Sequence, residues 1–117
     1  MKKLFAILGS LSVVLSLYAQ EVPSFPGGQD ALNSYISEHT QYPPMAKENG
    51  IEGIVQIGFT VMTDGSLSNA KVLRFIDPDL EKEALRVVTG MPAWIPAEKD
   101  GTPIEAPSVV DIPFILE

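Results

Sequence analysis

The sequence predicts an α+β fold in which two helices pack on one face of a three-stranded antiparallel sheet. Apolar and polar residues alternate from Ile54 to Thr63 and again near the C-terminus, as in strands with one buried face. Two other segments have apolar residues at the spacing of amphipathic helices. The length of 117 residues fits a single domain.

The N-terminus has the layout of a secretory signal peptide. Lys2 and Lys3 precede an apolar run from Leu4 to Leu17, and Ala19 supplies a small residue at the cleavage point. We therefore expect residues 1–19 to be a signal peptide that is removed on export. An uncleaved membrane anchor is the alternative, although the run is shorter than the roughly 20 residues needed to cross a bilayer.

The domain is expected to follow a short segment rich in Pro and Gly, residues 20–28, and to occupy residues 29–117. Its first helix is predicted from Gln29 to His39, because the apolar residues of this segment share one helical face. The helix cannot continue through the two prolines that follow Tyr42, since proline lacks the N–H that a helix requires. A short second helix is predicted from Met45 to Asn49.

A β-hairpin is predicted in the middle of the chain. Its first strand runs from Ile54 to Thr63, and the returning strand runs from Leu67 to Phe75. Asp64 and Gly65 lie between the strands and are expected to take the positive φ angles of a tight turn. The residues of the first strand expected to face inward are Val55, Ile57, Phe59 and Val61.

Another long helix is predicted after the hairpin. Asp77 is suited to cap its start and Pro78 to occupy its first position, whereas Gly90 and Pro92 end it. Its buried stripe is expected to comprise Leu80, Ala84, Leu85, Val88 and Met91.

The C-terminal part is predicted to be a loop followed by one strand. Trp94 to Pro107 contains several prolines and is expected to lack regular pairing. Trp94 itself either covers the end of the core or serves as an exposed anchor for a partner. The last strand, Val109 to Leu116, contains Pro113, which cannot donate to a neighbouring strand and therefore places the strand at a sheet edge. Its expected inward-facing residues are Val110, Ile112, Phe114 and Leu116.

Composition argues against several classes of function. The absence of cysteine excludes disulfides, thiolate zinc sites and cysteine nucleophiles. Fifteen acidic residues against eight basic ones make a nucleic-acid backbone an unsuitable partner. The single histidine, His39, is interpreted as a residue favoured at a helix C-terminus. Asp77 and Asp79 are interpreted as capping residues, and Glu81 and Glu83 point to different sides of their helix. We therefore predict no catalytic residues, no metal and no cofactor; an unrecognised hydrolase is the least favoured alternative.

The order of these elements resembles the C-terminal domain of TonB-family proteins, most of all the version found in Bacteroidetes-type bacteria. The resemblance covers about residues 25–117. It depends on the order in which several short motifs follow one another and not on any single motif. The matching residues are Phe25-Pro26-Gly27-Gly28, Tyr42-Pro43, Ala46, Gly50-Ile51-Glu52-Gly53, Val55, Phe59-Thr60-Val61, Asp64-Gly65, Val72, Leu80, Glu83-Ala84, Met91-Pro92, Trp94, Pro96, Gly101, Pro103 and Pro113-Phe114.

The resemblance implies a periplasmic protein-binding module for outer-membrane receptors. Such a module captures a short receptor segment, the TonB box, as an added strand at a sheet edge, and an exposed edge strand is physically suited to this. The expected binding residues are those of the last strand, namely Ser108, Val109, Asp111, Pro113 and Ile115. Tyr42 and Pro43 carry over from the family as a second receptor contact, with packing against the sheet as the alternative.

The sequence departs from the family's energy-transducing form. About eight residues separate the apolar leader from the domain, and at 3.3–3.6 Å each they reach less than about 30 Å. This distance is far too short to cross a periplasm, so the sequence favours binding over force transmission. The second hypothesis is a structural or assembly component that self-associates, including as a homodimer, through its exposed strands.

Overall fold

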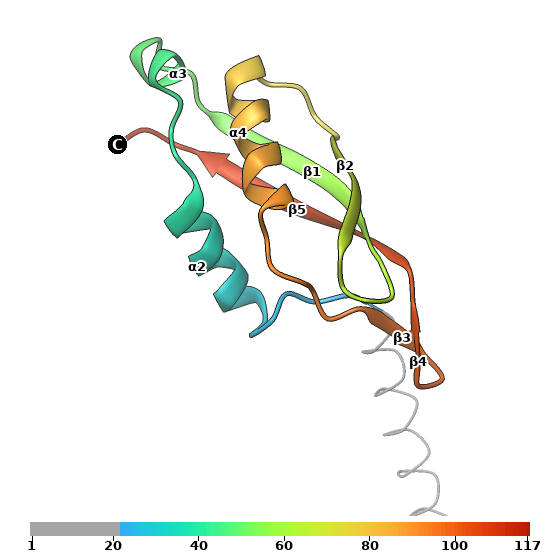
Figure 1. Ribbon diagram of the computed structural model, residues 1–117. Coiled ribbons are helices and arrows are strands. Elements are labelled where there is room, and N and C mark those ends of the chain that lie inside the picture. Colours follow the sequence, from blue (N-terminus) through green and yellow to red (C-terminus); the bar gives the residue numbers. More distant parts are fainter. Residues whose placement is uncertain (1–21) are drawn as a thin grey trace, which may run out of the picture.

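The computed structural model describes residues 22–117, and Figure 1 shows the arrangement of their elements. The predicted signal peptide, residues 1–19, lies outside the described part. Two longer helices, α2 (Gln29–His39) and α4 (Pro78–Thr89), cover one face of a three-stranded antiparallel sheet. The predicted α+β architecture is therefore confirmed. Within the described part of the chain, no helix combines the length and the apolar character required to span a membrane.

The sheet has the strand order β2-β1-β5, so β1 (Gly53–Val61) is central. Its neighbours, β2 (Leu67–Val72) and β5 (Ala106–Phe114), are both edge strands. One face of β1 and β5 is buried as the alternation predicted, because it packs on the two helices. The buried residues of this face are Val55, Ile57, Phe59, Val61, Val110, Ile112 and Phe114.

The hairpin between β1 and β2 forms, but its turn differs from the prediction. Only Gly65 has a positive φ, 87°, whereas Asp64 does not. The Gly65 N–H donates to the Met62 carbonyl at 2.9 Å, and the Met62 N–H donates to the Ser66 carbonyl at 2.8 Å. This is a three-residue loop closed by one left-handed glycine rather than a two-residue turn. Hydrogen bonds from the Ser66 hydroxyl and backbone hold the pKa of Asp64 below its usual range.

The returning strand is shorter than predicted. β2 ends at Val72 instead of continuing to Phe75, which is 84% exposed. The pairing register with β1 shifts at a bulge where Asn69 takes a φ of 56°. The Leu73 N–H still donates to the Gln56 carbonyl at 2.8 Å, after which the chain leaves the sheet to begin α4.

Helix α4 begins as predicted. The Asp77 carboxylate accepts hydrogen bonds from the backbone N–H groups of Asp79 and Leu80, at 3.0 and 3.2 Å. The buried stripe differs in part, because it follows positions i, i+4, i+7 and i+8 from Leu80. Val87 therefore belongs to the stripe, whereas the predicted Leu85 and Met91 are only partly buried; the buried residues are Leu80, Ala84, Val87 and Val88.

The segment predicted as a loop without regular pairing contains a small hairpin. β3 (Ala97–Lys99) pairs antiparallel with β4 (Thr102–Ile104), and β5 then begins at Ala106, three residues before the predicted Val109. The prolines of this region are compatible with pairing because each strand has one side without a neighbour, where a missing N–H costs no ladder bond. The short helix also starts one residue early, as α3 (Pro44–Glu48).

Trp94 is part of the core. Only 5% of its surface is exposed, and its ring meets those of Phe25 and Phe59 edge-on at centroid distances of 5.8 and 5.1 Å. The chain before α2 is held against this end of the core, because Ser24 and Ile95 exchange backbone hydrogen bonds of 3.0 and 2.8 Å. Trp94 therefore has the covering role rather than that of an exposed anchor.

Candidate partner-binding edge

Within residues 22–117, no strand lies beside the outer side of β5, which therefore offers backbone hydrogen-bonding groups. In an antiparallel pair, residues alternate between those that bond to the neighbouring strand and those whose N–H and C=O point away. Asp111 lies opposite Gln56 of β1. The Gln56 carbonyl accepts from Leu73 on the β2 side, so the Gln56–Asp111 pair is not hydrogen-bonded. The N–H and C=O of Asp111 therefore point outward, away from the sheet.

The same alternation fixes the orientation of the other β5 residues. Val109 lies two positions before Asp111, and its N–H also points outward. Pro107 and Pro113 share this alternation, so their missing N–H groups leave no gap in the β1 ladder. The free edge thus presents the N–H groups of Val109 and Asp111, which lie between the two prolines. Each of these four residues also presents its carbonyl.

Four of the five residues predicted for the last strand lie together. The side chains of Val109, Asp111, Pro113 and Ile115 are all exposed, and the two apolar ones are 49% and 67% exposed. Ser108 is separated from them by the alternation of the strand. Its backbone groups face β1, and its side chain lies on the helix side, near Trp94.

A groove of about 650 Å³ runs between α2 and the C-terminal half of β5. Sequence reasoning did not single out its helical wall, although polar residues at positions i and i+4 of a helix indicate an exposed face. The residues of α2 and its C-cap that line the groove are Asn33, Ile36, Ser37 and Thr40. The residues on the opposite side are Ile54, Asp111, Pro113, Phe114, Ile115 and Glu117.

Tyr42 lies at the end of this groove and is held from two sides. Its ring is perpendicular to that of Phe114, at a centroid distance of 5.6 Å, and its hydroxyl donates to the Ile51 carbonyl. Burial, and then the nearby Glu52 carboxylate, raise the pKa of Tyr42 above its usual range. Pro43 is half-buried and precedes α3 as its N-cap. The structure thus places Tyr42 beside the C-terminal end of β5 and gives it a packing role there.

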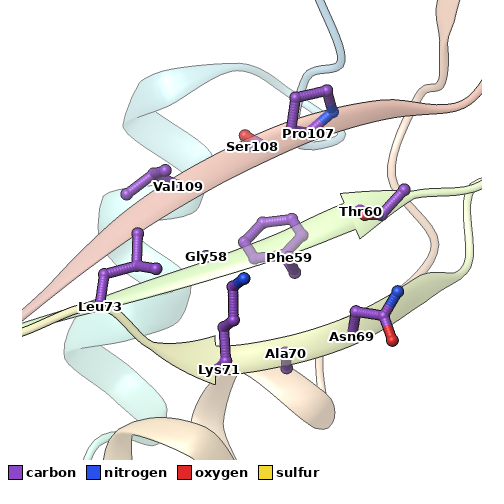
Figure 2. A pocket seen from close by; sticks show the side chains of 10 residues that line it. All are labelled: Gly58, Phe59, Thr60, Asn69, Ala70, Lys71, Leu73, Pro107, Ser108 and Val109. Atoms are coloured by element: carbon purple, nitrogen blue, oxygen red, sulfur yellow. The ribbon is translucent and has the colours of Figure 1, made fainter.

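The face of the sheet opposite α2 and α4 has a separate shallow hollow of about 560 Å³. Figure 2 shows Gly58 on the middle strand, with the side chains of Leu73 and Val109 near each other at one end of the hollow. A β-carbon on Gly58 would come within 2.9 Å of the Leu73 side chain, so the glycine makes room for this leucine. The hollow adjoins the free edge of β5 through Val109.

The single histidine has a local structural role. The His39 ring stacks on that of Tyr35 at 3.9 Å, and its Nδ1 is 2.8 Å from the Tyr35 carbonyl oxygen. Glu83 is likewise engaged with Arg86 and the backbone of Gln41. Within residues 22–117, no cluster of three or more side chains with metal-binding chemistry is present.

Comparison with known proteins identifies the family. A family model described as Gram-negative bacterial TonB protein C-terminal matches residues 38–116. Protein TonB of Helicobacter pylori (strain 26695) is 31% identical over 77 residues, which cover 65% of this chain and 27% of that protein. Protein TonB of Haemophilus influenzae is 39% identical over 61 residues, which cover 51% of this chain and 23% of that protein. The chain therefore matches about a quarter of the length of these curated relatives.

A solved structure is similar over most of the domain. It is the NMR solution structure of the Helicobacter pylori TonB-CTD, residues 179–285, with 28% sequence identity and a TM-score of 0.56. The similarity covers 73% of this chain and 77% of that one. Together with the family match, which spans more than half of the sequence, this shows that the chain belongs to the TonB C-terminal domain family.

Proposed function

We propose that the protein is a periplasmic binding module for TonB-dependent outer-membrane receptors, which captures an extended receptor segment along the free edge of β5. The observation that carries the proposal is the outward orientation of the Val109 and Asp111 backbone groups. Membership of the TonB C-terminal family supports the link to receptor transport. The proposed role consists of binding and includes no catalytic step.

The physical basis is β-augmentation. An edge strand has N–H and C=O groups that only water satisfies, and an added strand replaces that water with a regular ladder. Here Pro107 and Pro113 restrict donation to the stretch between them, so the captured segment aligns with Val109 and Asp111. Side chains of that segment would alternate between the groove beside α2 and the open face of the sheet.

The test is an NMR titration of the ¹⁵N-labelled exported protein with N-terminal receptor peptides from the same genome. The expected result is that amide shifts concentrate at Val109, Asp111 and Ile115. Asp111→Pro should weaken capture without unfolding the domain, because the lost N–H faces outward. Absence of binding by every peptide, or shifts confined to other surfaces, contradicts the proposal.

Val72→Pro is the matched control on the opposite edge. Val72 pairs with Ile57 at a position where the β1 groups bond to β5, so its own N–H faces away from β1. This variant should bind receptor peptides as the unchanged protein does, apart from a modest loss of stability from altered packing.

The alternative function is self-association through the exposed strands. The observation that favours it is the second free edge, on β2, because one copy could place this edge against β5 of another. Sedimentation velocity over a concentration series distinguishes the two functions. A stable dimer that both Asp111→Pro and Val72→Pro disrupt would favour self-association, whereas a monomer at all concentrations favours peptide capture.

A further inference from the structure

The groove beside β5 has a charge that restricts what it can hold. Two acidic residues, Asp111 and Glu117, are among the residues that line it, and no lysine or arginine is. Its floor is apolar, with Ile36, Tyr42 and Phe114 contributing to the lining. We propose that the segment captured at this edge is a basic one, in which apolar residues alternate along the strand and Lys or Arg lies at its flanks. This inference rests on the proposed function and adds the chemistry of the partner.

The carboxylate of Asp111 is available for such a partner. Its only hydrogen bond within the described chain comes from the Gln56 side-chain amide, at a long 3.3 Å. Its side chain is exposed next to the outward N–H and C=O of the same residue. A Lys or Arg on a paired strand would thus lie directly across from this carboxylate, as in cross-strand ion pairs.

The cations of the domain lie elsewhere. The six Lys and Arg residues between 22 and 117 are on α3, α4, β2 and β3 and in the segment that follows β2, and none lines the groove. Arg86 approaches the end of α2 through a 2.8 Å hydrogen bond to the His39 carbonyl, but its guanidinium is already paired with Glu83 at 2.7 Å. No Lys or Arg of the groove lining offsets these acidic residues, so charge complementarity favours an incoming segment of the opposite sign.

The experiment compares two designed peptides with the same alternating Val-Thr core, flanked by lysine in one and by glutamate in the other. Affinities for the exported protein are measured by NMR titration at low and at physiological salt. The lysine-flanked peptide should bind about fivefold more tightly at low salt, as expected for two exposed ion pairs, and the difference should narrow as salt screens the charges.

Two double variants test whether the groove causes the tighter binding of the lysine-flanked peptide. Asp111→Asn combined with Glu117→Gln should abolish most of the difference in affinity between the two peptides. Glu48→Gln combined with Asp100→Asn changes the net charge equally at exposed sites outside the groove and should retain it. Asparagine suits position 100 because the backbone there has a φ of 54°.

The outcomes separate this inference from the function on which it rests. If the glutamate-flanked peptide binds at β5 as tightly as the lysine-flanked one or more tightly, the inference of a basic partner is wrong and edge capture stands. The same conclusion follows if the preference for lysine survives the replacement of both Asp111 and Glu117. Failure of both peptides and of all receptor peptides to bind overturns edge capture as well. A dimer that places the Lys71-bearing edge of a second copy on β5, and that the lysine peptide cannot displace, also overturns the inference.

Discussion

The carboxylate of Glu83 accepts a 2.7 Å hydrogen bond from the backbone N–H of Gln41, which joins α4 to the segment that follows α2. The same carboxylate pairs with Arg86, whose guanidinium donates in turn to the His39 carbonyl at 2.8 Å. One side chain of α4 thus holds the segment that follows α2 against α4. Because α2 is a wall of the groove beside β5, this link contributes to the shape of the proposed binding site.

Replacing this carboxylate should destabilise the domain. We expect Glu83→Gln to lower the free energy of unfolding by about 1–2 kcal/mol, because hydrogen bonds to a charged group are stronger than those to an amide. Urea denaturation followed by circular dichroism measures the change. Glu48→Gln, at an exposed site on α3, should change stability by less than about 0.5 kcal/mol. Equal effects of the two variants would contradict the structural role of Glu83.

The stability contributed by Glu83 should depend on pH. The Arg86 hydrogen bond holds the pKa of Glu83 below its usual range, despite the opposing effect of burial. A depressed carboxylate pKa adds stability above the unfolded-state pKa, near 4.3, and this stability is lost as pH falls through the folded-state pKa. The stability difference between the unchanged protein and Glu83→Gln should therefore be constant from pH 7 to about 5.5 and shrink below about pH 4. A difference that stays constant to pH 3 would show that ionisation is not its source.

The hairpin turn should not tolerate a side chain at Gly65. Its φ of 87° is unfavourable for other residues, and an added β-carbon would overlap the Trp94 carbonyl oxygen. We expect Gly65→Ala to cost more than about 2 kcal/mol, measured by thermal or urea unfolding. Gly101→Ala is the matched control, because Gly101 has a φ of 79° but open space around it, and it should cost only about 1 kcal/mol. Equal costs would mean that backbone conformation alone explains the loss.

The cap of α4 should act through its oxygen rather than through its charge. Asp77→Ala removes the acceptor for two backbone N–H groups and should cost about 1 kcal/mol. Asp77→Asn keeps an oxygen at the same position and should retain most of that stability. If the asparagine variant is as unstable as the alanine variant in urea denaturation, the charge next to the helix N-terminus is the dominant effect.

Local signals were sufficient for much of the fold. Alternation identified β1, and the Asp77-Pro78 pair placed the start of α4. The prolines of the C-terminal region were harder to interpret. Pro113 correctly indicated an edge strand. The prolines between Trp94 and Pro107 led to the prediction of a loop, although β3, β4 and the first residues of β5 lie there. Whether a proline disrupts a strand depends on which side of that strand has a neighbour, and strand order alone decides this.

The candidate site shows the same division. Alternation along the last strand was enough to group Val109, Asp111, Pro113 and Ile115 on one exposed face. Sequence reasoning also grouped Ser108 with them, although the pairing with β1 turns its backbone inward. The wall formed by Asn33 and Ser37 escaped notice, because nothing local relates α2 to a strand about seventy residues later.

By itself, the sequence determined the two longer helices, the strands of the three-stranded sheet, the family and the edge position of the last strand, because caps, alternation and proline chemistry act over a few neighbouring residues. Only the tertiary structure decided which backbone groups of β5 face outward and which helix stands beside them. Those two properties depend on contacts between residues far apart in the chain, where register and packing, rather than local preference, set the geometry.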